Sequence, residues 1–566
     1  MIRYLLKKLL DIIHRYKLWP PIVFGLVCIV LCVKVVSGLD RFDSMYDMSR
    51  FGMRNLFLFI WGVPTFIYMR EVIYRKKTGR TYMIDKMKYD RSFLQLVDYY
   101  KDADPYQIDP DTLPKEDWKD SEGIILGRFK GGLIKRSAFE KGGEGVNVGV
   151  FGLPGTGKTA AILIITALVY GGSILCLDIK GDILSATKKY RDVRIFAPDD
   201  PDHSCHYNPM SGIYSMTEDD DKIEFVERIA AILVPKEREK YWFQTGRALF
   251  CGITFIMLDK NPRATLPDIA KAILKGSSTE WINIIRNSDC ELAQIYTNTL
   301  FKSSETNLQG AYGSLANVVR PFATGRMSRL LNDDGDVLSP ADLDSGYDIY
   351  IEIPEKKVET YSFITTIIVQ QFMDAFRDRP DKSTNIKQQP VMFMLDEFPR
   401  LHFDFETISS AMSTFRSKCV SVMTAMQSVS QLSNKYGTDA RDEFVDLLHY
   451  FAIISAQNPV SREFFQKLIG EKKVLKATSD SSSQEAREYI FQSADFANLG
   501  DNVVIYDNGK YVLAEKIFWY KDFDENAFLP NQSYSSSGIS YDKFLSHDDR
   551  TEDDFLIKDD DYEGYL

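Results

Sequence analysis

The chain has 566 residues, of which 45% are hydrophobic and 26% charged, and its mean hydropathy is −0.21. These values are typical of two or three globular domains and exclude a transporter built from many membrane spans. Seven scattered cysteines imply no disulfide framework. The net charge of −11 argues against a surface that is basic throughout.

The first 77 residues contain two apolar stretches, 22–39 and 55–69. The first is interrupted only by Lys34 and is close to the shortest length that spans a bilayer. Each stretch alone could be a buried helix, but together they favour a hairpin in a membrane. Lysines and arginines crowd both outer flanks, and the positive-inside rule therefore predicts that both termini are cytoplasmic.

A phosphate-binding loop is the strongest motif of the chain. Its residues, which fit the pattern G-x-x-x-x-G-K-[ST], are Gly152, Leu153, Pro154, Gly155, Thr156, Gly157, Lys158 and Thr159, and Ala160 follows. A strand-like stretch precedes it at 146–151 and a helical one follows at 160–170, which is the context that the motif requires. Lys158 would reach the β- and γ-phosphates and the Thr159 hydroxyl would bind Mg²⁺, whereas a chance glycine-rich turn is the alternative.

A helical insertion is predicted between two strands of the core, 173–179 and 347–353. From about 216 to 334 the sequence is largely helical, with a period of 3.6 residues in 223–233 and 243–258. Aromatic residues 241–243 could stack nucleic acid bases, although aromatic residues at helical spacing more often belong to a core.

A second motif, an apolar run at 391–395 followed by Asp396 and Glu397, predicts a buried parallel strand with two acids at its carboxyl end. Open α/β sheets bind their ligands at that end. Asp396 would hold Mg²⁺ and Glu397 would polarise the attacking water. A strand that ends in a solvated acid pair is the simpler alternative.

Two further candidates follow the acid pair. A helix is predicted over 405–415, a strand over 419–425 and another helix from 428. Gln427, at the end of the strand, could orient the attacking water or could be a surface residue. Arg416 could reach the γ-phosphate of a neighbouring subunit, or could simply oppose the dipole at the carboxyl end of its helix.

The last segment, 531–566, starts with serine-rich sequence and becomes acidic from 548 to 563. Such composition predicts disorder. The tail could solubilise the chain, or its interspersed aromatic residues could dock a basic partner.

The motifs as a set resemble the type IV secretion coupling proteins, the TraG/TraD-like ATPases of conjugative DNA transfer. The similar stretches lie within about 123–516 and are 178–182, 241–258, the helix that contains Gln370 and Gln371, 395–401, 414–416 and 425–432. One departure is the Leu-Pro-Gly-Thr sequence at 153–156, which is more similar to general AAA-type ATPases.

The resemblance implies an α/β fold with a RecA-like P-loop core, formed by 78–215 and 335–530. It also implies an inserted all-α domain at 216–334, a two-helix membrane anchor at 1–77 and an acidic tail at 531–566. The family assembles as hexamers in the bacterial cytoplasmic membrane, binds ATP and Mg²⁺ between subunits, and passes relaxase-bound DNA, expected to be single-stranded, to a secretion channel. Proteins are possible cargo, and accessory proteins are expected partners.

Two other functions stay open from the sequence. The chain could be a double-stranded DNA translocase of the FtsK/HerA kind, but after Lys516 it offers an acidic tail where a winged-helix reader is expected. It could also be a receptor that uses ATP only to assemble or gate a secretion machine. The residues themselves do not name DNA as cargo.

Overall fold

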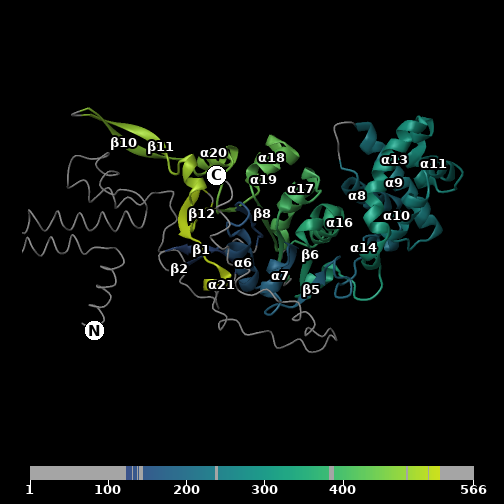
Figure 1. The fold of residues 1–566 in the computed structure, drawn as a ribbon, viewed down its shortest axis with the longest axis horizontal. Helices are drawn as coiled ribbons and strands as arrows, with labels where there is room; N and C mark the ends of the chain where they lie inside the picture. Colours follow the sequence, from purple (N-terminus) through teal and green to yellow (C-terminus); the bar gives the residue numbers. More distant parts are fainter. Residues whose placement is uncertain are drawn as a thin grey trace, which may run out of the picture. The chain divides into compact units, whose positions relative to one another are not determined.

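A computed structural model describes residues 123–129, 132–136, 138, 144–235, 240–381, 388–479, 482–507 and 509–522 (Figure 1). The predicted membrane spans, 22–39 and 55–69, and the acidic tail lie outside these residues. Among the described helices, none is long and apolar enough to cross a membrane.

An eleven-stranded sheet forms the core, in the order β2-β1-β13-β12-β9-β3-β8-β7-β4-β6-β5. Its parallel strands are β3 (Asn147–Phe151), β4 (Ser173–Ile179), β5 (Val193–Phe196), β6 (Asp348–Ile353), β7 (Val391–Leu395), β8 (Val420–Met426) and β9 (Tyr450–Ile453). The remaining strands, β1 (Ile124–Phe129), β2 (Gly132–Arg136), β12 (Asn502–Asp507) and β13 (Lys510–Glu515), extend it by antiparallel pairing.

The parallel strands are where the apolar runs predict them. β3, β4, β7 and β8 are buried along their whole length, as expected for strands covered on both faces. The predicted ranges for β4 and β7 are confirmed, and β3, β6 and β8 differ by a single residue at their ends. The α/β class is therefore confirmed, whereas the antiparallel extension was not predicted.

Helices cover both faces of the sheet. Figure 1 shows α16 and α17 on one side of the strands and α6 and α7 on the other. These helices are α6 (Ile164–Val169), α7 (Asp182–Thr187), α15 (Pro340–Asp344), α16 (Val358–Arg377), α17 (Phe405–Phe415), α18 (Val429–Tyr436), α19 (Thr438–Asp446), α20 (Pro459–Ile469) and α21 (Trp519–Asp522). Short 3-10 segments are η5 (Glu355–Lys357), η6 (Phe398–Arg400), η7 (Arg416–Lys418) and η8 (Ser493–Ala497). The helix predicted after the phosphate loop begins with a π-helical turn, η2 (Thr159–Leu163), rather than as an α-helix.

Between β5 and β6 the chain is helical, as its periodicity predicts. It forms η3 (Ser211–Ser215), α8 (Asp219–Leu233), α9 (Lys240–Lys260), α10 (Leu266–Lys275), α11 (Ser278–Arg286), α12 (Glu291–Thr297), η4 (Asn298–Lys302), α13 (Glu305–Ala323) and α14 (Gly325–Leu330). Thr265 and Ser277 begin α10 and α11 with reciprocal capping boxes. In the aromatic cluster, Tyr241 is exposed and Trp242 lies against Gly310.

The two ends of the insertion meet. A bridge between His206 and Val337 joins the segment that leaves the core to the segment that returns. Tyr207 N donates to Leu330 O at 2.8 Å, which reinforces this pairing. The closed ends explain how so long an insertion interrupts the sheet between two neighbouring strands.

Residues 471–489 form a separate hairpin of β10 (Glu471–Ser479) and β11 (Ser482–Tyr489). The strands pair antiparallel, from Glu471 opposite Tyr489 to Ser479 opposite Ser482. No sequence motif predicted this hairpin.

Candidate active site

The carboxyl ends of four neighbouring strands, in the order β3-β8-β7-β4, define the site. β3 leads into the phosphate loop, β8 into Gln427, β7 into Asp396 and Glu397, and β4 ends at Ile179, just after Asp178. Parallel pairing brings these four ends to one edge of the sheet. Motifs that are far apart in the sequence therefore meet there.

The phosphate loop adopts a turn that its glycines permit. Gly155 and Gly157 have φ of 75° and 99°, in the left-handed region that favours glycine. A Cβ at Gly157 would also lie 3.0 Å from Cε1 of Phe518. Thr156 Oγ1 donates to Leu153 O at 2.7 Å and closes the turn. The loop therefore has the backbone shape of a phosphate cradle.

Lys158 lies inside the loop, with 6% of its side chain exposed. Its Nζ donates to Gly152 O at 2.7 Å and lies 3.8 Å from Glu397 Oε1. Burial lowers the pKa of Lys158, although the charges of Glu397 and Asp396 oppose that shift. The ammonium thus faces the acid pair, as the two motifs together predict.

Glu397 is held in an unusual backbone conformation beside Asp396. Its φ is 49° and ψ 41°, which are costly for a residue with a Cβ and recur at functional sites. Glu397 N donates to Asp396 Oδ1 at 3.0 Å. Gln427 Nε2 donates to both carboxylate oxygens of Glu397, at 3.3 and 3.2 Å. Gln427 therefore lies next to the acid, and its direct contact is with Glu397.

Because of this contact, we expect Gln427→Leu to slow ATP turnover about tenfold while the affinity for nucleotide changes by less than about threefold. Leucine keeps the volume but removes hydrogen bonds to a charged group, which are worth roughly 1.5–3 kcal/mol. Steady-state turnover together with binding of a fluorescent nucleotide separates the two quantities. The matched control is Gln466→Leu. Gln466 lies on α20, and the change removes the hydrogen bond from its side chain to Phe491 O. Equal losses in both variants would remove Gln427 from the site.

Asp178 also lies at the site, although in the sequence it stands out only as part of the stretch 178–182 that resembles the coupling proteins. It is fully buried on β4, and its Oδ2 accepts a hydrogen bond from Leu184 N at 2.7 Å. Its Oδ1 is buried without a hydrogen-bond partner among the described residues. An acid near the carboxyl end of an apolar strand is the same signal that identified Asp396, and it would have found Asp178.

The carboxyl terminus of the described chain also reaches the loop. Lys516 Nζ donates to Thr156 O at 3.2 Å, and Leu153 N donates to Ser455 Oγ at 3.1 Å. No sequence motif marks Lys516 or Ser455 as part of the site. Both residues reach the loop because of the order of the strands in the sheet.

The site carries an excess of buried negative charge. Burial raises the pKa of Asp178, and burial together with the charge of Glu397 raises the pKa of Asp396 to about 7. A divalent cation would relieve the repulsion between these carboxylates. The Asp178 oxygen that has no hydrogen-bond partner among the described residues could bind such a cation or a water molecule of its coordination shell. The described residues contain no cluster of three protein metal ligands. The geometry therefore fits a cation held by a hydroxyl, one or two carboxylates and phosphate oxygens, as Mg²⁺ prefers.

Asp396 makes stability depend on pH. Its pKa is about 7 in the folded protein and about 3.9 in an unfolded chain, so the folded state binds more protons between these values. The stabilisation of the folded state by protonation of Asp396 is complete below pH ~4. This stabilisation, on the order of 4 kcal/mol, is lost as the pH rises through ~7. We expect Asp396→Asn to remove this slope.

The measurement is the free energy of unfolding by urea at pH 5 and pH 8, without nucleotide. The difference between the two pH values should shrink in Asp396→Asn. The exposed Asp289→Asn, on the helical insertion, should keep the wild-type difference. An unchanged difference in Asp396→Asn would show that Asp396 ionises normally.

Arg416 caps the carboxyl end of helix α17 at the surface, where the sequence places it. It follows the end of α17, its side chain is 51% exposed, and it forms an ion pair with Glu144. Its role at a neighbouring subunit stays a prediction.

A parallel strand that leads into this loop, with an acid pair two strands away at the same edge of the sheet, defines a nucleotide-binding site of the P-loop class. Residues 108–547 match the family model described as Type IV secretory system Conjugative DNA transfer. The chain belongs to this family, and the resemblance noted in the sequence is confirmed.

Curated relatives agree. The chain is 24% identical over 348 residues to Protein VirD4 of Rhizobium radiobacter, covering 58% of this chain and 48% of the relative. It is 19% identical over 427 residues to the conjugal transfer protein TraG of Agrobacterium fabrum, covering 70% and 64%. The chain thus spans about half the length of VirD4 and somewhat less than two thirds of TraG.

Solved structures share the fold. The plasmid coupling protein TrwB in complex with the ATP analogue ADPNP superposes with a TM-score of 0.57 at 17% identity, covering 75% of this chain and 96% of that one. TrwB in complex with ADP and Mg²⁺ gives 0.57 at 18% identity, covering 75% and 95%.

Proposed function

We propose that this protein is an ATP-dependent coupling protein of conjugative DNA transfer. The observation that carries the proposal is the meeting of Lys158, Glu397 and Gln427 at the carboxyl edge of the sheet, beside a glycine loop shaped for phosphate. Membership of the conjugative transfer family supports the biological setting. The TrwB complexes with ADPNP and with ADP and Mg²⁺ support ATP and Mg²⁺ as ligands.

In the proposed reaction, the loop amides and Lys158 bind the phosphates and stabilise the charge that develops during transfer. Thr159 and Asp396 would hold Mg²⁺, which neutralises phosphate charge when bound. Glu397 accepts a proton from the attacking water, and Gln427 holds the carboxylate in place. Asp178 supports the cation or its water from the neighbouring strand.

We further propose that the protein works as a hexamer with nucleotide between subunits. Arg416 would then meet the nucleotide of the neighbouring subunit. Its ion pair with Glu144 is half-exposed, and such surface pairs contribute roughly 1 kcal/mol or less to stability. Arg416 could therefore leave Glu144 and bind a phosphate group at a small cost in free energy. Hydrolysis in one subunit would reposition the next and move DNA.

The remaining parts of the proposal concern location and partners. Residues 22–39 and 55–69 would anchor the protein in the bacterial cytoplasmic membrane with both termini cytoplasmic. Its cargo would be relaxase-bound single-stranded DNA, together with accessory proteins, delivered to a type IV secretion channel. Protein cargo would use the same route.

The test is ATP turnover of the full-length protein in lipid, with single-stranded DNA, double-stranded DNA or neither, and Glu397→Gln as the blank. We expect stimulation by single-stranded DNA that disappears in the blank. Stimulation by duplex alone would instead indicate a double-stranded translocase. Turnover that ignores both forms of DNA would overturn the motor and leave a receptor that gates the channel.

A further inference from the structure

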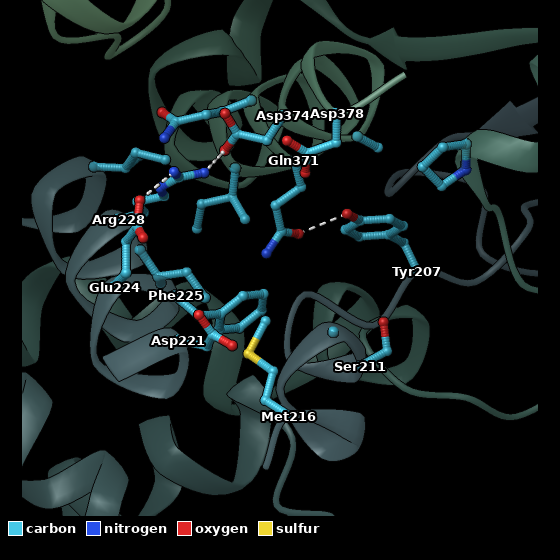
Figure 2. A pocket seen from close by; sticks show the side chains of 17 residues that line it. Tyr207, Ser211, Met216, Asp221, Glu224, Phe225, Arg228, Gln371, Asp374 and Asp378 are labelled. Carbon is cyan, nitrogen blue, oxygen red and sulfur yellow. Dashed lines mark hydrogen bonds and ion pairs between the residues drawn. The ribbon is translucent and has the colours of Figure 1, made fainter. Parts of the chain in front are cut away.

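A second cavity lies between the helical insertion and the core, with a volume of about 480 Å³. Its walls come from α8 of the insertion, α16 of the core and the segment 207–216, through which the chain passes from the core into α8. Figure 2 shows the side chains that line it. None of them is a residue of the nucleotide site described above. The volume is in the range of small-molecule sites, roughly 300–1,000 Å³.

Gln370 supplies an unsatisfied polar group in this cavity. Its side chain is only 6% exposed, it lines the cavity, and it has no side-chain hydrogen bond to any described residue. The adjacent Gln371 is different. Its Oε1 accepts from Tyr207 Oη at 2.6 Å and its Nε2 donates to Pro209 O at 2.8 Å. The Gln370 carboxamide lines the cavity without a protein hydrogen-bond partner among the described residues, so it is available to a ligand.

The cavity is also acidic. Asp221, Glu224, Asp374 and Asp378 line it, against the single cation Arg228. Arg228 is already engaged, since its guanidinium pairs with Glu224 and, at 2.8 Å, with Asp374, as Figure 2 shows. Asp221 and Asp378 are exposed and have no ion pair within the described chain. Two carboxylates therefore remain for a positively charged ligand.

Apolar side chains complete the lining. They are Met216, Phe225, Ile229, Ile232, Pro340, Ile367 and Ala375. An inorganic cation needs oxygen ligands on most sides, which these residues cannot provide. A ligand that suits the whole cavity has an apolar body and a cationic end.

We propose that this cavity binds an organic cation, an ammonium or guanidinium group carried on an apolar body. The cation pairs with Asp221, the body contacts Phe225 and Met216 beside it, and Gln370 hydrogen-bonds a polar atom of the ligand. The same chemistry could come from a free organic amine or from a basic side chain of a polypeptide. A ligand here contacts both the insertion and the core, and its binding does not require nucleotide.

The test is calorimetric titration of the full-length protein, without nucleotide, with 3-phenylpropylamine and with its uncharged counterpart 3-phenylpropan-1-ol. We expect the amine to bind at least about tenfold more tightly, and this preference to fall as salt is added. Gln370→Leu should weaken amine binding about fivefold to tenfold, which is the usual effect of one lost hydrogen bond. Asp221→Asn should weaken it severalfold. The matched surface variant Asp289→Asn should leave it unchanged.

Equal binding of amine and alcohol, or amine binding that survives both Gln370→Leu and Asp221→Asn, would overturn the proposal. A short lysine-containing peptide forms the second arm. If it binds more tightly than the free amine and loses affinity in the same variants, the cation comes from a polypeptide. All variants should keep the wild-type melting temperature and ATP turnover, so this proposal and the proposed ATPase fail independently.

Discussion

Lys158→Ala is expected to reduce ATP turnover at least about a hundredfold and to weaken nucleotide binding. The variant removes the ammonium that would contact the β- and γ-phosphates, and such charge contacts are typically worth 10²–10³ in rate. Lys158 is nearly buried and 3.8 Å from Glu397, so its loss also removes a close countercharge from the acid pair. Turnover and nucleotide affinity, each measured on the purified full-length protein, give the two effects.

Lys222→Ala is the matched control for that variant. Lys222 forms an ion pair with Asp219 at 3.0 Å on α8, outside the nucleotide site. It should keep wild-type turnover and affinity. Wild-type turnover in Lys158→Ala would mean that phosphate binds elsewhere on the protein.

Glu397→Gln is expected to lower turnover roughly a thousandfold with little change in nucleotide affinity. Glutamine has nearly the same volume, so the left-handed backbone at this position and the packing around it are preserved. Its amide cannot accept a proton from water, which removes the proposed general base. Nucleotide should therefore bind and remain unhydrolysed, and single-turnover kinetics would show a slow chemical step after normal binding.

Glu463→Gln tests whether loss of a carboxylate alone has an effect. Glu463 is exposed on α20 and should tolerate the change fully. If Glu397→Gln hydrolysed ATP at a normal rate, Glu397 would be excluded as the base. The proton would then pass to another group, and Asp178 would be the first to test because its carboxylate oxygen is unpartnered.

Local sequence was sufficient for the parts of the fold that depend on short-range patterns. Long apolar runs located β4 and β7 to the residue, and a 3.6-residue period located α8 and α9 within the insertion. The phosphate loop was identifiable because glycine, lysine and threonine at fixed spacing have one backbone geometry in common. The boundaries of the domains and the roles of Arg416 and of the tail stay predictions.

The edge of the sheet was less predictable. β12 and β13 form a local hairpin, but β1 pairs with β13 and β12 pairs with β9 across long separations in the chain, and these pairings are not visible in local periodicity. The π-helical first turn after Lys158 was equally hidden, because helix type depends on backbone hydrogen bonds rather than on residue type.

The sequence by itself identified the main candidate residues of the nucleotide site, namely the loop that ends at Thr159 and the acids Asp396 and Glu397. Only the tertiary structure decided that Gln427 bonds Glu397, that Asp178 and Lys516 join the site, and that α8 and α16 enclose a second cavity. The reason is physical. A motif is set by the steric and electronic needs of adjacent residues, whereas neighbours across a sheet or between helices are set by the order in which strands pair and by the packing of distant segments.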